Sequence, residues 1–130
     1  MNKYIFLLST FLLVSCCSEV QSATEVPMPS GKEIYIPKDL RGMDLQNPDS
    51  KWSYHRMAYT DNFVIFWEKG FGNDLSNPPQ LEGHDMKVDL SNLTEKLESF
   101  YHFFRDTLKF SKPGSKCDKY RMMVMLNYSL

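Results

Sequence analysis

The sequence has few cysteines, and their positions exclude a disulfide framework. Only Cys16, Cys17 and Cys117 are cysteines among the 130 residues, and two of them are adjacent. Small secreted domains that depend on disulfides carry several spaced pairs. If Cys16 is modified, as argued below, only Cys17 and Cys117 are left to pair, and two unpaired thiols are the simpler expectation.

An excess of basic charge is also absent. The chain has 15 Lys and Arg against 16 Asp and Glu, which gives a formal net charge of −1. Proteins that bind the phosphate backbone carry a basic stripe or patch. The charge balance therefore predicts that nucleic acid is not a partner.

The common motifs of metal and phosphate binding are missing from the chain. It contains no His-Glu-x-x-His, no Cys-x-x-Cys and no glycine-rich loop after a strand. Glu98 and His102 are four residues apart on a predicted helix, but they fall on its polar face, where a solvated pair is the simpler interpretation. His84 next to Asp85 in a loop is more simply an exposed turn than an acid–base pair. We predict no catalytic residue, no metal ligand and no cofactor within this chain.

A hydrophobic run long enough to cross a membrane is absent too. Residues 4–14 are apolar and uncharged and follow Lys3, but a spanning helix needs roughly 20 such residues. The pattern is typical of a signal peptide. Residues 13–16 read Leu-Val-Ser-Cys and resemble the bacterial lipobox, in which a lipid is placed on the cysteine and the chain is cut before it. We predict a signal peptide at residues 1–15 and lipidation of Cys16; the alternative is a buried apolar strand followed by two chance cysteines.

Lipidation would anchor the protein to a membrane without a spanning helix. We expect a palmitate-type anchor in the bacterial envelope, in the outer membrane, with the periplasmic or surface face left open. Residues 16–31 are polar and contain Pro27 and Pro29, so they are predicted to form a flexible tether. Residues 32–130 are predicted to form one small domain.

The first half of this domain has the pattern of a β-hairpin. Residues 33–36 form a short extended piece, and residues 52–59 and 63–67 are β-prone runs joined by a turn at 60–62. The second run is almost entirely apolar, which predicts a strand covered on both faces. A long loop at residues 68–88 follows, and loops of this length are usually functional or mobile.

The second half begins with an amphipathic helix, for which Asp89 or Ser91 is the expected N-cap. Its apolar residues share one face: Leu90, Leu93, Leu97, Phe100, Tyr101, Phe104 and Leu108. Residues 120–126 then predict a strand buried on both faces, which is the pattern of a central strand. The fold class is therefore α+β: a hairpin, one long helix and a buried C-terminal strand. These elements give a central strand little covering, so we expect the N-terminal part of a larger domain; the alternative is a natural small α+β domain.

Aromatic residues gather around the predicted hairpin. Trp52 and Trp67 flank it, and His84 lies in the long loop beyond. Aromatic faces can stack on sugar rings or hold peptides, although hairpin aromatics more often fill a core. These three residues are the candidate ligand-binding residues of a non-enzymatic module that binds glycan or peptide.

Four segments carry a resemblance to a known family: residues 52–57, 63–72, 93–101 and 120–130. In these segments the chain resembles the N-terminal portion of uncharacterised lipoproteins from gut-type Gram-negative anaerobes. Members of that family continue beyond the Asn-Tyr-Ser-Leu strand to a His-Glu-x-x-His helix and look like zinc metallopeptidases of the zincin type. The resemblance implies an incomplete zincin-like domain, with zinc bound only in the full-length family. No zinc ligand or catalytic Glu of the family matches a residue of this chain, so we expect the chain itself to be a truncated and catalytically silent relative.

Overall fold

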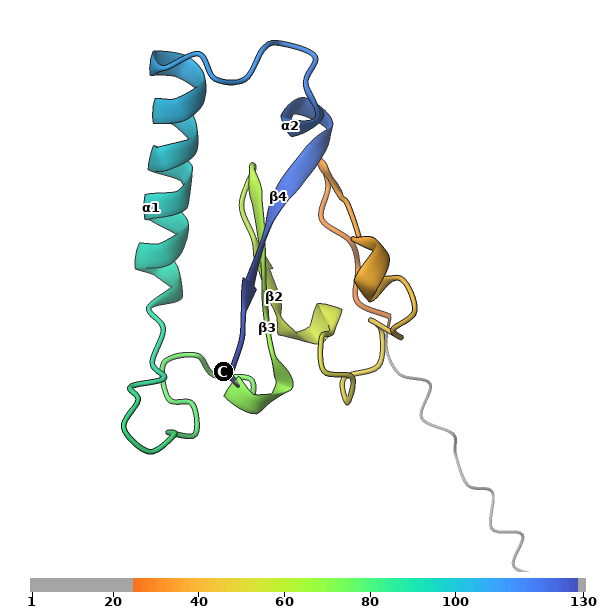
Figure 1. Ribbon diagram of the computed structural model, residues 1–130. Coiled ribbons are helices and arrows are strands. Elements are labelled where there is room, and N and C mark those ends of the chain that lie inside the picture. The colour runs from red at the N-terminus through yellow and green to blue at the C-terminus, as the bar shows by residue number, and fades with distance from the viewer. Residues whose placement is uncertain (1–24, 129–130) are drawn as a thin grey trace, which may run out of the picture.

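The sheet is built around the two apolar runs that the sequence predicts as strands. The computed structural model describes residues 25–128, so the predicted signal peptide, Cys16 and Cys17 lie outside the described residues. β3 (Phe63–Trp67) and β4 (Tyr120–Leu126) run parallel to each other, and β1 (Glu33–Ile34) pairs with β4 in parallel. β2 (Met57–Tyr59) pairs with β3 in antiparallel orientation, which gives the order β1-β4-β3-β2. The predicted α+β class is confirmed (Figure 1).

The first strand of the predicted hairpin is shorter than expected. Residues 52–59 were predicted to be extended, but η2 (Tyr54–Arg56) is a 3-10 turn and only Met57–Tyr59 forms strand. Ser53 caps the turn by accepting a hydrogen bond from the backbone N–H of His55, at 3.2 Å. The guanidinium of Arg56 is buried and donates to the carbonyl oxygens of Pro48 and Ser50. Such side-chain bonds to the backbone compete with strand pairing, which explains the shorter strand.

The predicted helix forms with its expected cap. α1 (Leu90–His102) begins after Asp89, whose carboxylate accepts from the backbone N–H of Asn92 at 2.9 Å. It continues into a π-helical turn, η4 (Phe103–Thr107), and a short helix, α2 (Lys116–Lys119), precedes β4. Two more 3-10 turns, η1 (Lys38–Leu40) and η3 (Lys69–Phe71), lie in the loops. Within residues 25–128, no helix is long and apolar enough to cross a membrane.

The core lies on both faces of the sheet. Figure 1 shows α1 on one side of the sheet and residues 36–52 on the other. On the side of residues 36–52, the buried cluster comprises Leu40, Leu45, Trp52, Val64 and Phe66. On the helix side, a second cluster at the carboxyl end of β3 comprises Trp67, Phe71 and Leu75. Val64, Ile65 and Phe66 are fully buried, so the prediction of a strand covered on both faces is confirmed for β3.

The same prediction holds only in part for β4. It is central, as expected, because β1 and β3 pair with its two edges. Six of its seven residues are nevertheless only partly buried, and Arg121 is the only one that is buried. The helix stripe is also incompletely covered, because Phe100 and Leu108 are 59% and 42% exposed. The apolar stripe of the predicted helix is therefore only partly buried against the sheet.

The segment predicted to be a free tether is partly held by the domain. The backbone N–H of Val26 donates to Oε1 of Gln46 at 3.0 Å. The carbonyl oxygen of Ser30 accepts from Nη2 of Arg121 at 2.8 Å. Within residues 25–128, contacts with the domain are therefore present from Val26 onward, several residues before the predicted boundary at residue 31.

Candidate functional site

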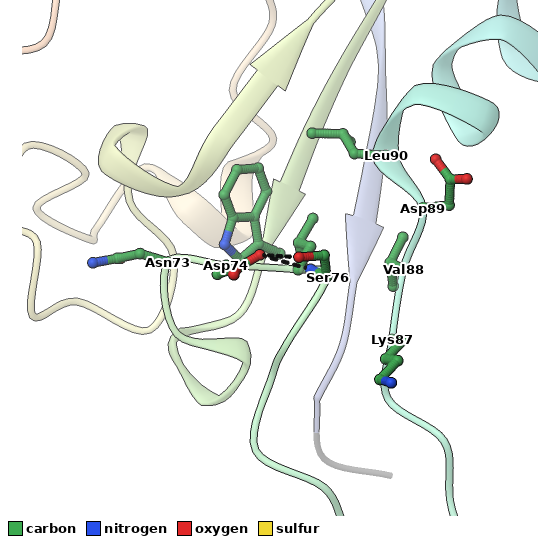
Figure 2. Close-up of a pocket in the computed structure, with 9 residues that line it drawn as sticks. Asn73, Asp74, Ser76, Lys87, Val88, Asp89 and Leu90 are labelled. Carbon is green, nitrogen blue, oxygen red and sulfur yellow. Dashed lines mark hydrogen bonds between the residues drawn. The ribbon is translucent and has the colours of Figure 1, made fainter.

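A hollow of about 540 Å³ opens at the carboxyl ends of β3 and β4, between the long loop and the start of α1 (Figure 2). In sheets with parallel strands, ligands commonly bind outside the carboxyl ends of the strands. The residues that line the hollow come from β3, the loop and the N-terminus of α1: Trp67, Asn73, Asp74, Leu75, Ser76, Lys87, Val88, Asp89 and Leu90. This position makes the hollow the leading candidate site among the described residues.

The floor of the hollow is held by the second core cluster. Trp67 is the last residue of β3, and its indole N–H donates to the carbonyl oxygen of Gly72 at 3.0 Å. Gly72 has φ +70, a left-handed conformation that glycine adopts without strain. The backbone N–H of Val88 donates to the carbonyl oxygen of Leu75 at 2.8 Å, which joins the two sides of the long loop. The hollow is therefore preformed by local bonds.

The two carboxylates of the hollow are already engaged. Asp74 accepts hydrogen bonds from the hydroxyl and the backbone N–H of Ser76, at 2.6 and 2.9 Å, and these bonds hold the pKa of Asp74 below its usual value. Asp89 caps α1. The groups left at the rim include the exposed side chains of Asn73 and Lys87, beside the apolar floor. The residues that line the hollow can bind a ligand through apolar contacts and hydrogen bonds, but they do not include a paired acid and base.

The structure separates the three residues predicted to bind a ligand. Trp52 lies in the core cluster on the opposite side of the sheet and is 5% exposed. Trp67 is 7% exposed and contributes to the floor of the hollow. His84 is exposed in the long loop, where its backbone N–H closes a turn onto the carbonyl oxygen of Leu81 at 3.0 Å, and it does not line the hollow. Only Trp67 therefore belongs to a candidate site.

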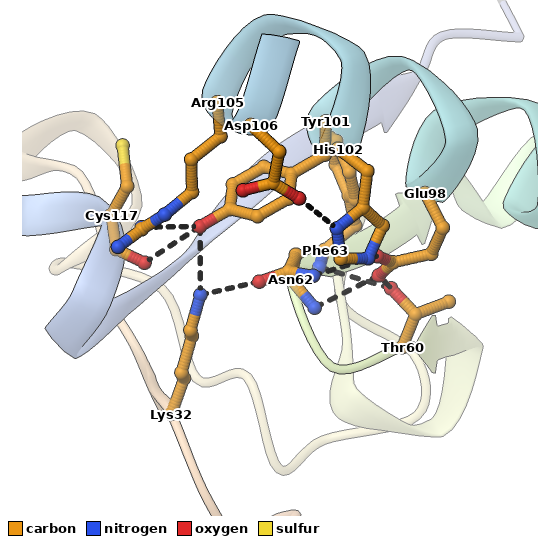
Figure 3. Close-up of polar contacts among 10 residues, drawn as sticks. All are labelled: Lys32, Thr60, Asn62, Phe63, Glu98, Tyr101, His102, Arg105, Asp106 and Cys117. Carbon is orange, nitrogen blue, oxygen red and sulfur yellow. Dashed lines mark hydrogen bonds and ion pairs between the residues drawn. The ribbon is translucent and has the colours of Figure 1, made fainter. Parts of the chain in front are cut away.

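At the opposite end of the sheet, Glu98 binds the β2–β3 turn (Figure 3). Its carboxylate accepts from the hydroxyl of Thr60 and from the backbone and side-chain N–H groups of Asn62, the latter two at 2.9 and 2.7 Å. Nε2 of His102 lies 3.9 Å from Oε2 of Glu98, and Nδ1 of His102 lies 2.9 Å from Asp106. Sequence reasoning placed Glu98 on a solvated helix face and missed this role, which depends on a turn 36 residues away. Among residues 25–128, no group of three potential metal ligands occurs.

The hydroxyl of Tyr101 is a second junction in the same region (Figure 3). It accepts from Nζ of Lys32 at 3.1 Å and from Nη1 of Arg105 at 2.8 Å. Arg105 also forms an ion pair with Asp118, and the hydrogen bonds that Arg105 donates to the Asp118 carboxylate and the Tyr101 hydroxyl raise the pKa of Arg105 above its usual value. Cys117 is an unpaired, half-buried thiol next to this junction. These contacts tie α1, α2 and the N-terminal segment together, which is a structural role.

Replacing Glu98 should weaken the fold in a pH-dependent manner. Burial raises the pKa of Glu98, but the hydrogen bonds from Thr60 and Asn62 outweigh burial and hold the pKa below its usual 4.5. The stabilisation is therefore complete above pH 4.5 and is lost as the pH falls through the lowered pKa. We expect Glu98→Gln to lower the free energy of unfolding by about 1–2 kcal/mol at pH 7 and by much less at about pH 3. Urea unfolding at the two pH values measures the difference.

Glu95→Gln is the matched control for this experiment, because Glu95 lies on the same helix and is exposed. We expect this variant to unfold within about 0.5 kcal/mol of the wild type at both pH values. Equal effects of the two substitutions at pH 7 would show that the bonds from Glu98 to the turn contribute nothing to stability.

The comparison with known proteins gives one match. Residues 27–130 match a family that is described as a family of unknown function, DUF6055. No curated protein and no solved structure matches the chain. The description of this family carries no information on lipidation or on zinc.

Proposed function

We propose that this chain, which belongs to the DUF6055 family of unknown function, is a lipid-anchored envelope protein whose folded part is the non-catalytic front portion of a zincin-like metallopeptidase domain. The arrangement of the elements supports this proposal. β3, α1 and β4 form a parallel strand–helix–strand unit, and β2 adds an antiparallel strand at one edge. The four-segment resemblance to zincin-like lipoproteins is compatible with this order of elements.

The observation that carries the proposal is the incomplete burial of β4. A central strand with an apolar sequence is normally covered on both faces. β3 meets this expectation, whereas Met122, Met123, Val124, Met125 and Leu126 of β4 are each only partly buried. Apolar surface that stays in contact with water is unfavourable. We therefore propose that a further layer of the domain covers β4.

Within this proposal the described residues supply scaffold. A zincin activates a water molecule on zinc that is held by side chains of its His-Glu-x-x-His helix. The described residues do not fit such a site, because they contain no group of three ligands, and no catalytic step is assigned to them. β2 lies at the edge of the sheet, and an edge strand can pair with an extended peptide.

The nucleotide sequence beyond the codon of Leu130 tests the metallopeptidase proposal. An in-frame continuation, or one restored by a single frameshift, that encodes His-Glu-x-x-His would support it. A different gene that starts immediately after this codon would contradict it. The lipid anchor is tested separately, so the two parts of the proposal can fail independently.

Replacing Cys16 should abolish lipidation. The thioether to the diacylglycerol requires the sulfur of Cys16, so we expect Cys16→Ser to take up no labelled palmitate and to keep its signal peptide. Palmitate labelling in the native bacterium and the mass of the purified chain measure both effects. Fractionation of the envelope then determines whether the lipidated wild type resides in the outer membrane, as we propose.

Cys17→Ser is the control, because it changes the adjacent cysteine and leaves the predicted lipobox at residues 13–16 intact. We expect this variant to be labelled and processed like the wild type. If Cys17→Ser loses the label and Cys16→Ser keeps it, the lipid is on Cys17, which would contradict the proposal.

The hollow at Trp67 favours a second function, a non-enzymatic module that binds glycan or peptide. Its apolar floor and the exposed Asn73 and Lys87 are typical of a shallow binding surface. Trp52 does not contribute to this proposed binding site, because its ring lies in the core. Glycan-array binding that is lost in Asn73→Ala and Lys87→Ala, without a change in unfolding, would support this function over the first.

A further inference from the structure

The end of α1 and the turn after it expose an unusual number of aromatic side chains. Phe100, Phe103, Leu108 and Phe110, here called the aromatic end, are 59%, 49%, 42% and 72% exposed. They make up half of the large apolar side chains that are exposed in the described chain. Exposed apolar groups gathered in one place indicate a surface that contacts another molecule or a membrane.

The local backbone holds these rings in place. α1 passes into the π-helical turn η4, and Lys109 then adopts the left-handed conformation with φ +56. The backbone N–H of Phe110 donates to the carbonyl oxygen of Phe104 at 3.1 Å. The ring of Phe104 lies 4.2 Å from that of Phe100 and 5.2 Å from that of Phe110, measured between centroids. The aromatic end is therefore an ordered surface.

Basic residues are frequent in the segment that carries the aromatic end. Residues 100–120 contain five Lys and Arg and two Asp, whereas the whole chain has 15 basic and 16 acidic residues. Arg105 is paired with Asp118, and Lys119 lies 3.7 Å from Glu33. Lys109, Lys112 and Lys116 are exposed. The segment that carries the aromatic end is therefore basic, in a chain whose formal net charge is −1.

We infer that the aromatic end docks on a bilayer of anionic glycerophospholipids, with its apolar side chains among the headgroups and its lysines at the phosphates. Aromatic and basic residues on one surface are the composition of interfacial membrane contacts. A symmetric dimer through the same surface would bring lysines against lysines, which is unfavourable. The carboxyl end of β4 lies at the other end of the molecule from the end of α1 (Figure 1), whereas Met122, near the start of β4, lines an apolar hollow with Phe100, Phe104 and Phe110. A layer over the carboxyl-terminal half of β4 can therefore leave the aromatic end free.

This inference rests on the proposed lipid anchor. The stretch from Cys16 to Glu25 spans up to about 30 Å when extended, and α1 and η4 together are about 27 Å long at 1.5 Å per residue. The predicted tether is therefore about as long as the helical segment that leads to the aromatic end.

Depth-dependent quenching tests the inference on the whole lipidated chain. Phe110→Trp is mild because this side chain is 72% exposed. In vesicles that contain phosphatidylglycerol and spin-labelled phosphatidylcholine, we expect the new tryptophan to be quenched about threefold more than in vesicles without phosphatidylglycerol. The control is Met43→Trp, an exposed position in the loop on the other side of the sheet. We expect quenching of this control to be weak and insensitive to lipid charge.

A charge-reversal pair provides the second readout. In the Phe110→Trp background, Lys109→Glu and Lys112→Glu should each remove most of the roughly threefold difference that phosphatidylglycerol produces, whereas Lys38→Glu, a change at an exposed lysine in η1, should not. Equal quenching at Phe110→Trp and Met43→Trp, or concentration-dependent dimerisation that buries Phe110, would overturn the inference. The mass of the same preparation reports the lipid on Cys16. If the lipid is absent, the proposed anchor fails, and quenching with added vesicles still decides whether the aromatic end binds them.

Discussion

Trp52→Ala is expected to lower the free energy of unfolding by about 3–5 kcal/mol, because a large buried side chain is removed and the cavity closes only in part. Trp52 is 5% exposed and packs with Leu40, Leu45, Val64 and Phe66. Small domains are stabilised by roughly 5–15 kcal/mol, so this loss approaches the total. The variant should therefore be largely unfolded well below the melting temperature of the wild type, as circular dichroism would show.

Tyr59→Ala is the control for Trp52. Tyr59 is an aromatic residue of the same hairpin, but it is 52% exposed. Its ring lies over the guanidinium of Arg121, with 5.4 Å from Cζ to the ring centroid, and loss of this contact should cost about 1 kcal/mol or less. If Trp52→Ala instead stays folded and stable but no longer binds a glycan or peptide ligand, Trp52 belongs to the binding surface. This result would contradict its place in the core.

Arg121→Met is expected to destabilise the fold by about 3 kcal/mol and to release the N-terminal segment. Arg121 is 5% exposed, and its guanidinium donates to the carbonyl oxygens of Thr60 (2.7 Å), Lys32 and Ser30 (2.8 Å). Methionine keeps the apolar stem and leaves all three oxygens without this donor. Urea unfolding measures the loss of stability, and faster hydrogen exchange at residues 30–34 reports the release of the segment.

Two further variants make this prediction specific. Arg121→Lys keeps the charge, but a single ammonium cannot reproduce the planar fork of Arg, so we expect it to recover only part of the stability. Arg41→Met removes an arginine that also donates to a backbone carbonyl, that of Ile36, but on the exposed surface. We expect a loss of about 1 kcal/mol or less. If Arg121→Met and Arg41→Met have equal effects, Arg121 does not act as the clamp between β4, the hairpin turn and the N-terminal segment.

The strands and the start of the helix that local patterns specify were predicted where they occur. β3 and β4 coincide with the predicted runs at 63–67 and 120–126, and α1 begins after Asp89, one of the two predicted caps. The predicted apolar stripe continued to Leu108, whereas α1 ends at His102 and passes into the π-helical turn. Each rests on a signal that acts within a few residues, such as an apolar run or a side chain that caps the first turn. The long loop was predicted for the same reason, because its glycines and prolines prevent regular structure locally.

The candidate site was only partly predictable. Trp67 was found, whereas Trp52 and His84 were grouped with it and the structure places them elsewhere. Asn73 and Lys87 carried no signal in the sequence that distinguished them from other polar loop residues. The loop brings these residues to one hollow through the backbone bond between Val88 and Leu75, which joins positions 13 residues apart.

The sequence by itself determined the α+β class, the central position of β4, the helix with its cap and the absence of a familiar metal motif, because these depend on short-range pattern and composition. Only the tertiary structure decided which face of the sheet each tryptophan occupies, that Glu98 holds the β2–β3 turn, that β4 is only partly buried and that the aromatic end stays exposed. Each of these depends on how segments far apart in the chain pack together. A residue type specifies what a side chain can bind, and the packing of distant segments decides what it meets.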